Sequence, residues 1–138
     1  MMPRVRRRAL LILGVVLLAT STAFAGTYLN SAALLLAQGS TEAEYLRARV
    51  YDKELADLIH KLAAARLEAA KGMLVPKEVV QAHPHLLLVL ENYERAADAA
   101  TRGEGEKFLI YQQRARDEER TFRGVLKQFG YALPDVKQ

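Results

Sequence analysis

The sequence contains no cysteine, and it is poor in several other residue types. Its 138 residues include 4 Pro, 8 Gly and 7% aromatic residues, whereas 51% are hydrophobic. Without cysteine, the chain can form neither a disulfide framework nor a thiolate metal site. The low aromatic content, in a chain rich in alanine and leucine, favours a helical protein over a β-sandwich.

Motifs that mark common catalytic sites are also missing from the sequence. It has no glycine-rich phosphate loop and no G-x-S-x-G nucleophile elbow. The acidic pair Glu118 and Glu119 interrupts an apolar stripe, so we expect one carboxylate to point partly inward and to pair with an arginine of a neighbouring helix. No second acid stands at a catalytic spacing. We therefore expect no enzyme activity, no catalytic residue and no cofactor.

Basic charge is concentrated at the start of the chain. The formal net charge is +4, and Arg4, Arg6, Arg7 and Arg8 all lie in the first eight residues. Without these four, the 20 basic residues fall to 16 and equal the 16 acidic residues. A balanced remainder argues against a dedicated nucleic-acid or anionic-membrane surface, which needs a basic excess.

The first 25 residues have the pattern of a secretory signal peptide. The arginine-rich start is followed by the apolar run 9–19 and then by Ala23-x-Ala25, a small-residue cleavage site. We expect cleavage after Ala25. In the alternative interpretation the leader is retained as a signal anchor, because small and apolar residues continue to Ala37. Both interpretations place the rest of the chain on the far side of the membrane.

The stretch 41–71 contains neither Gly nor Pro and predicts one long helix. Thr41 and Glu44 match a capping box at its start, and Gly72 is expected to end it in a left-handed conformation. A shorter apolar helix, 28–38, is expected to end at Gly39-Ser40. The predicted core stripe of the long helix has the 4-3-4-3-4 spacing of a coiled-coil seam: Tyr51, Leu55, Leu58, Leu62, Ala65 and Ala69. Leu62, in the middle of the stripe, is expected to be a core residue.

Two further helices are predicted after a connector, 72–82, in which Pro76 begins a short turn. The third helix, 85–101, carries the stripe Leu86, Leu90 or Val89, Tyr93, Ala97 and Ala100. The fourth, 106–129, carries the stripe Phe108, Tyr111, Ala115, Phe122, Val125 or Leu126, and Phe129. Gly130 and Tyr131 are expected to close it in a Schellman motif, in which Tyr131 packs on Leu126.

These elements predict an all-α fold, an antiparallel bundle of about four helices of which one is long. We expect the signal segment at 1–25, the bundle domain at 26–134 and a loose tail at 135–138. The short first helix beside the long second one suggests that the bundle leaves apolar surface open, or that the leader or a partner chain completes it.

The three histidines, His60, His83 and His85, are weak candidates for a metal site. Imidazole suits several transition metals, and Asp57 lies three residues before His60 on the same helix face. Di-iron bundles, however, carry Glu-x-x-His on two helices, and that pattern does not occur here. His83 and His85 flank Pro84, so their side chains need not converge. We therefore expect no metal site.

Taken together, the patterns favour a non-enzymatic helical-bundle protein of the bacterial cell envelope. It would be exported to the periplasm or the extracellular space and would act by protein–protein binding or self-association, with no nucleic-acid partner. It would meet a membrane only through its N-terminal segment. One alternative is a periplasmic metal-binding or metal-sensing bundle. Another is a single-pass subunit anchored in the inner membrane, with its domain on the outer side.

Overall fold

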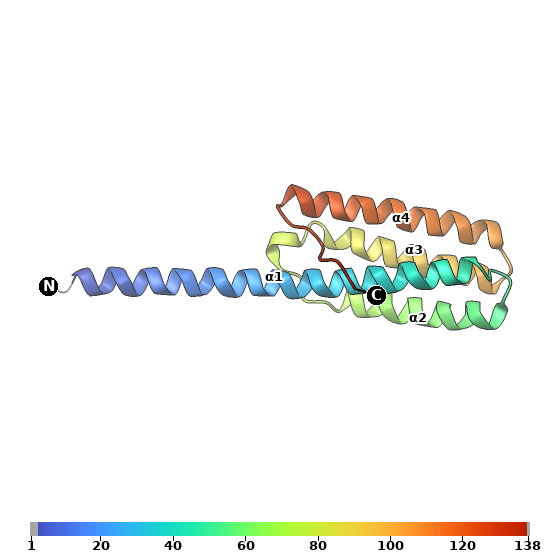
Figure 1. Ribbon diagram of the computed structural model, residues 1–138, viewed down its shortest axis with the longest axis horizontal. Coiled ribbons are helices and arrows are strands. Elements are labelled where there is room, and N and C mark those ends of the chain that lie inside the picture. The colour runs from blue at the N-terminus through green and yellow to red at the C-terminus, as the bar shows by residue number, and fades with distance from the viewer. Residues whose placement is uncertain (1–2, 138) are drawn as a thin grey trace.

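The structure of the chain, a computed structural model, is all helical over the residues that it describes. These are residues 3–137 for the backbone and 24–137 for the side chains. Along the described backbone the elements are α1 (Pro3–Arg47), α2 (Lys53–Lys71), the 3-10 turn η1 (Lys77–Val79), α3 (His83–Thr101) and α4 (Gly105–Gln128). Figure 1 shows the four α-helices side by side, with alternating directions. The predicted all-α antiparallel bundle is confirmed.

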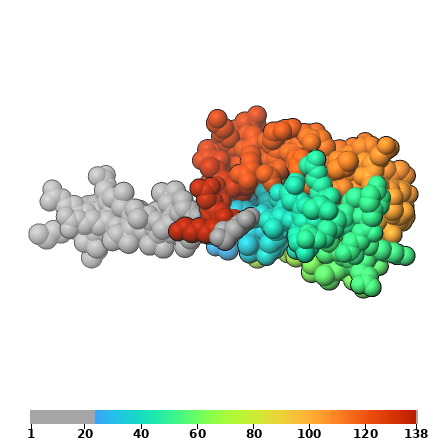
Figure 2. Space-filling view, turned by 45° about the vertical axis from the view of Figure 1, so that its right-hand side comes forward, coloured from blue at the N-terminus to red at the C-terminus, as the bar shows by residue number. Residues whose placement is uncertain are grey.

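The third helix occupies the centre of the arrangement. α3 contacts α1, α2 and α4, and its backbone approaches α4 and α2 most closely. α1 packs less closely on the other three helices, and its N-terminal half extends past them (Figure 1). The C-terminal segment that follows α4 turns back and lies across α1 (Figure 2). Pro134, Asp135 and Val136 there border a groove on α1, although the sequence suggested a loose tail from residue 135.

Most of the predicted signal segment lies outside the residues whose side chains the structure describes. Of residues 1–25, only Phe24 and Ala25 have described side chains; Phe24 is 43% exposed and Ala25 is buried. The α1 backbone is helical from Pro3 to Arg47, so the predicted cleavage point lies within a helix. Among residues 24–137, whose side chains the structure describes, no helix has both the length and the apolar character needed to cross a membrane.

The first two predicted helices are divided at the wrong place. Gly39 and Ser40 lie inside α1, and the chain turns instead at residues 48–52. Gly39 is needed for a contact between helices, since a Cβ there would lie 3.0 Å from a ring carbon of Tyr93 on α3. The capping box is therefore wrong, because Thr41 and Glu44 are interior residues of α1.

The true start of α2 is marked by Asp52, which the sequence analysis placed inside the long helix. One side-chain oxygen of Asp52 accepts a hydrogen bond from the backbone N–H of Leu55 at 3.1 Å, as an N-cap residue does. The turn before it leaves α2 with 19 residues, as many as α3. At 1.5 Å per residue both helices are about 28 Å long. The turn therefore gives α2 the same length as α3.

The other helix ends are mostly as predicted. Gly130 has φ 83°, and the N–H of Tyr131 bonds the carbonyl of Leu126 at 2.9 Å, which confirms the Schellman motif. Gly72 has φ −88°, so the expected left-handed conformation at the end of α2 is wrong. Pro76 precedes η1 as expected, and α3 and α4 begin within two residues of their predicted starts.

The core confirms the stripes of α3 and α4 in most positions. The predicted α3 residues are all buried: Leu86, Leu90, Tyr93, Ala97 and Ala100. On α4, four predicted residues are buried, namely Phe108, Ala115, Phe122 and Leu126. Tyr111 is only partly buried, and Phe129, at 44% exposed, is wrong as a core residue because it follows the last turn of the helix.

Candidate functional site

The apolar residues of α2 are divided between two faces, and only one of them faces the core. The buried face consists of Ala56, Ile59, Ala63, Arg66 and Ala70. The other face carries five residues of the stripe that was predicted to be core: Leu55, Leu58, Leu62, Ala65 and Ala69. We call these five residues the outer seam.

The outer seam is largely in contact with solvent. Leu58 is 55% exposed and Leu62 is 42% exposed. Ala65 and Ala69 are exposed as well, and Leu55 is partly buried. The prediction that Leu62 is a core residue is therefore wrong. Since a helix turns 100° per residue, the outer seam is centred about 100° around α2 from the buried face.

Tyr51, the first residue of the predicted stripe, does not belong to the seam. It lies in the turn before α2 and is 81% exposed. Its hydroxyl oxygen lies 3.4 Å from the position that a Cβ on Gly105 would take. Tyr51 therefore covers the start of α4 at the end of the bundle.

The burial pattern of α2 is unfavourable for a chain that stays alone. Burying a leucine side chain contributes about 1.5–3 kcal/mol, whereas an alanine offers far less apolar area. Yet α2 buries three alanines and one isoleucine and leaves Leu58 and Leu62 in water. A row of exposed large apolar residues with regular spacing is typical of a surface that binds another chain.

Charged side chains flank the outer seam. Lys61 and Glu68 lie along its solvent side, seven residues apart and therefore on the same line of the helix. Glu68 accepts a hydrogen bond from Lys71 at 3.0 Å, and both side chains are mostly exposed. Such an exposed pair contributes little to stability, so Glu68 is available to a competing cation.

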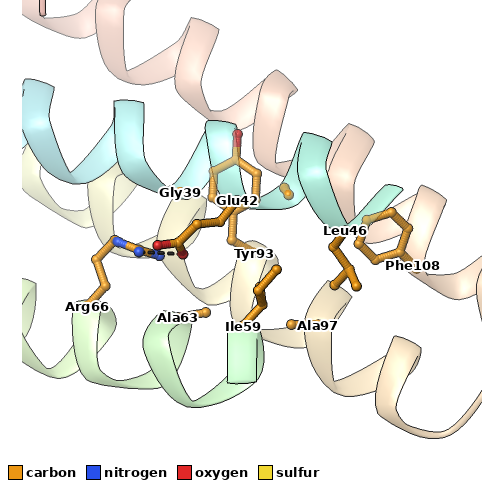
Figure 3. Close-up of a pocket in the computed structure, with 10 residues that line it drawn as sticks. Gly39, Glu42, Leu46, Ile59, Ala63, Arg66, Tyr93, Ala97 and Phe108 are labelled. Carbon is orange, nitrogen blue, oxygen red and sulfur yellow. Dashed lines mark hydrogen bonds and ion pairs between the residues drawn. The ribbon is translucent and has the colours of Figure 1, made fainter. Parts of the chain in front are cut away.

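On the other side of the seam, a charged pair joins α2 to α1. Arg66 is only 8% exposed, and it donates a hydrogen bond to Glu42 at 2.5 Å (Figure 3). The two side chains border a cavity of about 10 Å³ whose other walls include Ile59, Tyr93 and Phe108. A space of that size holds at most about one water molecule. This layer therefore fixes α1 against α2 and does not form a ligand pocket.

Sequence reasoning missed the role of Arg66, although a signal for it was present. The buried face has the spacing 3-4-3-4 from Ala56 to Ala70, and Arg66 occupies one of its positions. That second stripe is as regular as the outer seam. Its composition does not mark it as a core face, because alanine and arginine are also common on solvent-exposed helix surfaces.

Polar contacts also join α1 to the other two helices. Gln112 of α4, which is buried, donates a hydrogen bond to Glu44 at 2.9 Å, and Arg116 donates another to the same carboxylate. On α3, the hydroxyl of Tyr93 is hydrogen-bonded to Ser40, and burial raises its pKa. The segment 39–44 of α1 is thus bonded to all three of its neighbours.

The structure places each histidine against a different partner on another helix. The Nε2 atom of His60 lies 2.7 Å from a carboxylate oxygen of Glu94. The Nδ1 atom of His85 lies 3.3 Å from Glu118, and His83 is bonded to Tyr28. Nowhere among the described residues do three or more His, Asp or Glu side chains gather in a way that could hold a metal ion.

His83 links three helices through the hydrogen bonds of its ring. Its Nδ1 atom lies 2.8 Å from the hydroxyl of Tyr28 on α1, and the backbone of Ala70 at the end of α2 also bonds the ring. Burial lowers the pKa of His83, although the bond to Ala70 opposes the shift. Burial also raises the pKa of Tyr28, so its hydroxyl stays protonated. It can therefore donate a hydrogen bond to Nδ1 of the neutral imidazole.

Glu118 and Glu119 are both partly buried, which agrees with the expected inward orientation of one carboxylate. Their partners differ from the expected arginine of a neighbouring helix. Glu118 lies against His85 of α3, whereas Glu119 is paired with Arg123 of its own helix at 3.2 Å. Only the Glu118 contact therefore joins two helices, α3 and α4.

Comparisons of the chain with protein-family models, with curated proteins and with solved structures returned no match. A helical bundle as such serves many unrelated functions, so the fold alone does not indicate the function of this chain. The outer seam of α2 is an exposed apolar row with regular helical spacing, for which the folding of a single chain supplies no role.

Proposed function

We propose that this chain is an exported, non-enzymatic helical-bundle protein of the bacterial cell envelope, and that it binds other protein chains through the outer seam of α2. The observation that carries the proposal is the exposure of Leu58 and Leu62 on a helix that buries alanines instead. The regular spacing of the seam suits a partner helix, whose side chains would pack between those of α2.

The balanced charge of residues 9–138 and the absence of a catalytic motif support binding over catalysis. The buried Arg66 and the partly buried His60, His85 and Glu119 each have a side-chain partner on the same or a neighbouring helix. The arginine-rich start, the apolar run and the Ala23-x-Ala25 site support export.

Site-specific photo-crosslinking in cells that produce the chain tests the binding surface. A benzophenone amino acid would replace Leu62 in one variant and Leu58 in another. Leu109 is a matched control, since it is 46% exposed but lies on α4. We expect the same adduct from positions 58 and 62 and none from position 109. Equal labelling at all three positions, or none at any, would remove the support for the seam as a binding surface.

One observation favours the second candidate, a single-pass subunit with an uncleaved leader. The α1 backbone is helical on both sides of Ala25, and the Ala25 side chain is buried. Signal peptidase needs an accessible substrate, so cleavage has to precede folding of this segment. Intact-mass measurement on the envelope fraction decides between the two candidates. A chain that begins at Gly26 supports the exported form, and a full-length chain in the membrane pellet supports the anchored form.

A further inference from the structure

We infer that the partner of the outer seam is a second copy of this chain, bound with the two α2 helices antiparallel. This inference rests on the proposed function and names the partner at the same surface. It follows from how the large and small residues of the seam, and the charges beside it, match when α2 is placed against itself.

When two seams run in opposite directions, the large residues of one face the small residues of the other. Two leucines at positions 58 and 62 are followed by two alanines at positions 65 and 69. In an antiparallel pair, the register that places Leu62 against Ala65 of the second copy also places Leu58 against its Ala69. Each large side chain then meets a small one, which lets two helices pack closely. Leu55 meets Gly72 at the end of the same register.

The flanking charges match in that same register. Lys61 precedes Leu62 on the solvent side of the seam, and Glu68 precedes Ala69 on the same side. With the helices antiparallel, Lys61 of each copy lies opposite Glu68 of the other, so that a two-fold axis generates two identical ion pairs. Within the described part of a single chain, the carboxylate of Glu68 is paired with Lys71, and both side chains are exposed.

A parallel arrangement lacks both kinds of match. It would place Leu58 and Leu62 against their own copies and each alanine against an alanine, which leaves the alanine half of the seam poorly filled. It would also leave Lys61 of one copy about 10 Å along the helix axis from Glu68 of the other, so the two ion pairs could not form. Size and charge therefore both favour the antiparallel order.

The antiparallel order also bears on the leader. Because the two-fold axis is perpendicular to α2, the N-terminal ends of the two α1 helices point in opposite directions. Two copies anchored in the same membrane by uncleaved leaders could not pair in this way. The inferred dimer thus belongs to the cleaved form of the protein.

Engineered cysteines test the inference, since the native chain has none. Leu58→Cys and Ala69→Cys would each be introduced into the chain that begins at Gly26. The two purified variants would then be oxidised separately and as a mixture. We expect a disulfide-linked dimer only in the mixture, because 58 and 69 meet across the interface. Two copies of position 58 are separated by eleven residues, about 16 Å along the helix.

Each other result contradicts the inference in a distinguishable way. Dimers formed by each variant alone would indicate the parallel order. No dimer in any sample, together with a monomer at every concentration in sedimentation equilibrium, would rule out self-association. If Leu62 still forms a photo-adduct with a different protein, the proposed function holds and only the identity of the partner is wrong.

A charge exchange tests the register separately from the apolar contacts. Lys61→Glu would place a carboxylate opposite Glu68, and we expect the dissociation constant of the dimer to rise roughly tenfold. The double variant Lys61→Glu with Glu68→Lys should return it to within about twofold of the native value. Both positions are exposed, so the fold itself tolerates the changes. A double variant as weak as the single one would show that the register is wrong.

Discussion

α2 and α3 each contain 19 residues and carry a regular apolar stripe, but the two helices use their stripes in opposite ways. The predicted stripe of α3 is buried throughout, whereas that of α2 is exposed at Leu58 and Leu62. The difference follows from position, because α3 contacts three helices and α2 lies beside it at the edge. An apolar stripe indicates a helix face that packs against another helix. The position of the helix in the bundle decides whether that other helix belongs to the same chain.

The largest effect should come from removing a core leucine of α3. Leu90 is 1% exposed, and we expect Leu90→Ala to cost about 2–5 kcal/mol, because it leaves a cavity in a packed interior. Leu62→Ala should cost less than about 1 kcal/mol when measured at low protein concentration, where each chain is alone. Denaturant unfolding of both variants measures the contrast. Equal losses would mean that α2 and α3 bury their stripes alike.

The charged pair at the edge of α2 should have an intermediate effect. Glu42→Gln leaves Arg66 buried without its counter-charge, and we expect a loss of about 1–3 kcal/mol. The double variant with Arg66→Met removes both charges and should recover most of that loss. Thermal unfolding of both variants measures these changes in stability. If the double variant is less stable than the single one, then Arg66 stabilises the buried face by more than its bond to Glu42.

The smallest expected effect is a dependence of stability on pH, which comes from His83 at the start of α3. Burial lowers the pKa of His83 from its ordinary value of 6.5. Below about pH 6.5 the unfolded chain therefore takes up a proton that the folded chain does not, so stability should fall as pH decreases through this range. It should level off below the pKa of the folded state.

Unfolding of His83→Gln measured from pH 7 to pH 5 tests this expectation. The variant should lose part of the decrease in stability that the native chain shows, since glutamine does not titrate. Tyr28→Phe removes the hydroxyl that donates to Nδ1 and should weaken the same dependence. A native slope that is unchanged in His83→Gln would place the titrating group elsewhere.

Local signals predicted α3 and α4 well. Pro84 marks the first turn of α3, and the pair Gly130 and Tyr131 closes α4 with the expected hydrogen bond. These signals work because they act within one turn of the chain. The boundary at Gly39 failed because that glycine serves a contact with Tyr93, more than fifty residues away, which no local pattern reveals.

The candidate site was only half predictable from the sequence. The spacing of Leu58 and Leu62 identifies an apolar stripe, but the predicted core location of this stripe is wrong, because both leucines are exposed. α2 has two stripes with helical spacing, and the choice between them depends on how closely α1 and α3 approach. The histidine partners, such as Glu94 for His60, depend on the register between helices and could not be read from spacing along one helix.

The most direct test of the central claim is the Leu62→Glu variant, examined by thermal unfolding and by sedimentation at low and high concentration. If Leu62 belongs to a binding surface, the dilute variant should melt within a few degrees of the native chain and should stay monomeric at high concentration. The matched variant Ile59→Glu, which changes a residue only 6% exposed, should unfold. A Leu62→Glu chain that also unfolds when dilute would place Leu62 in the core and contradict the account.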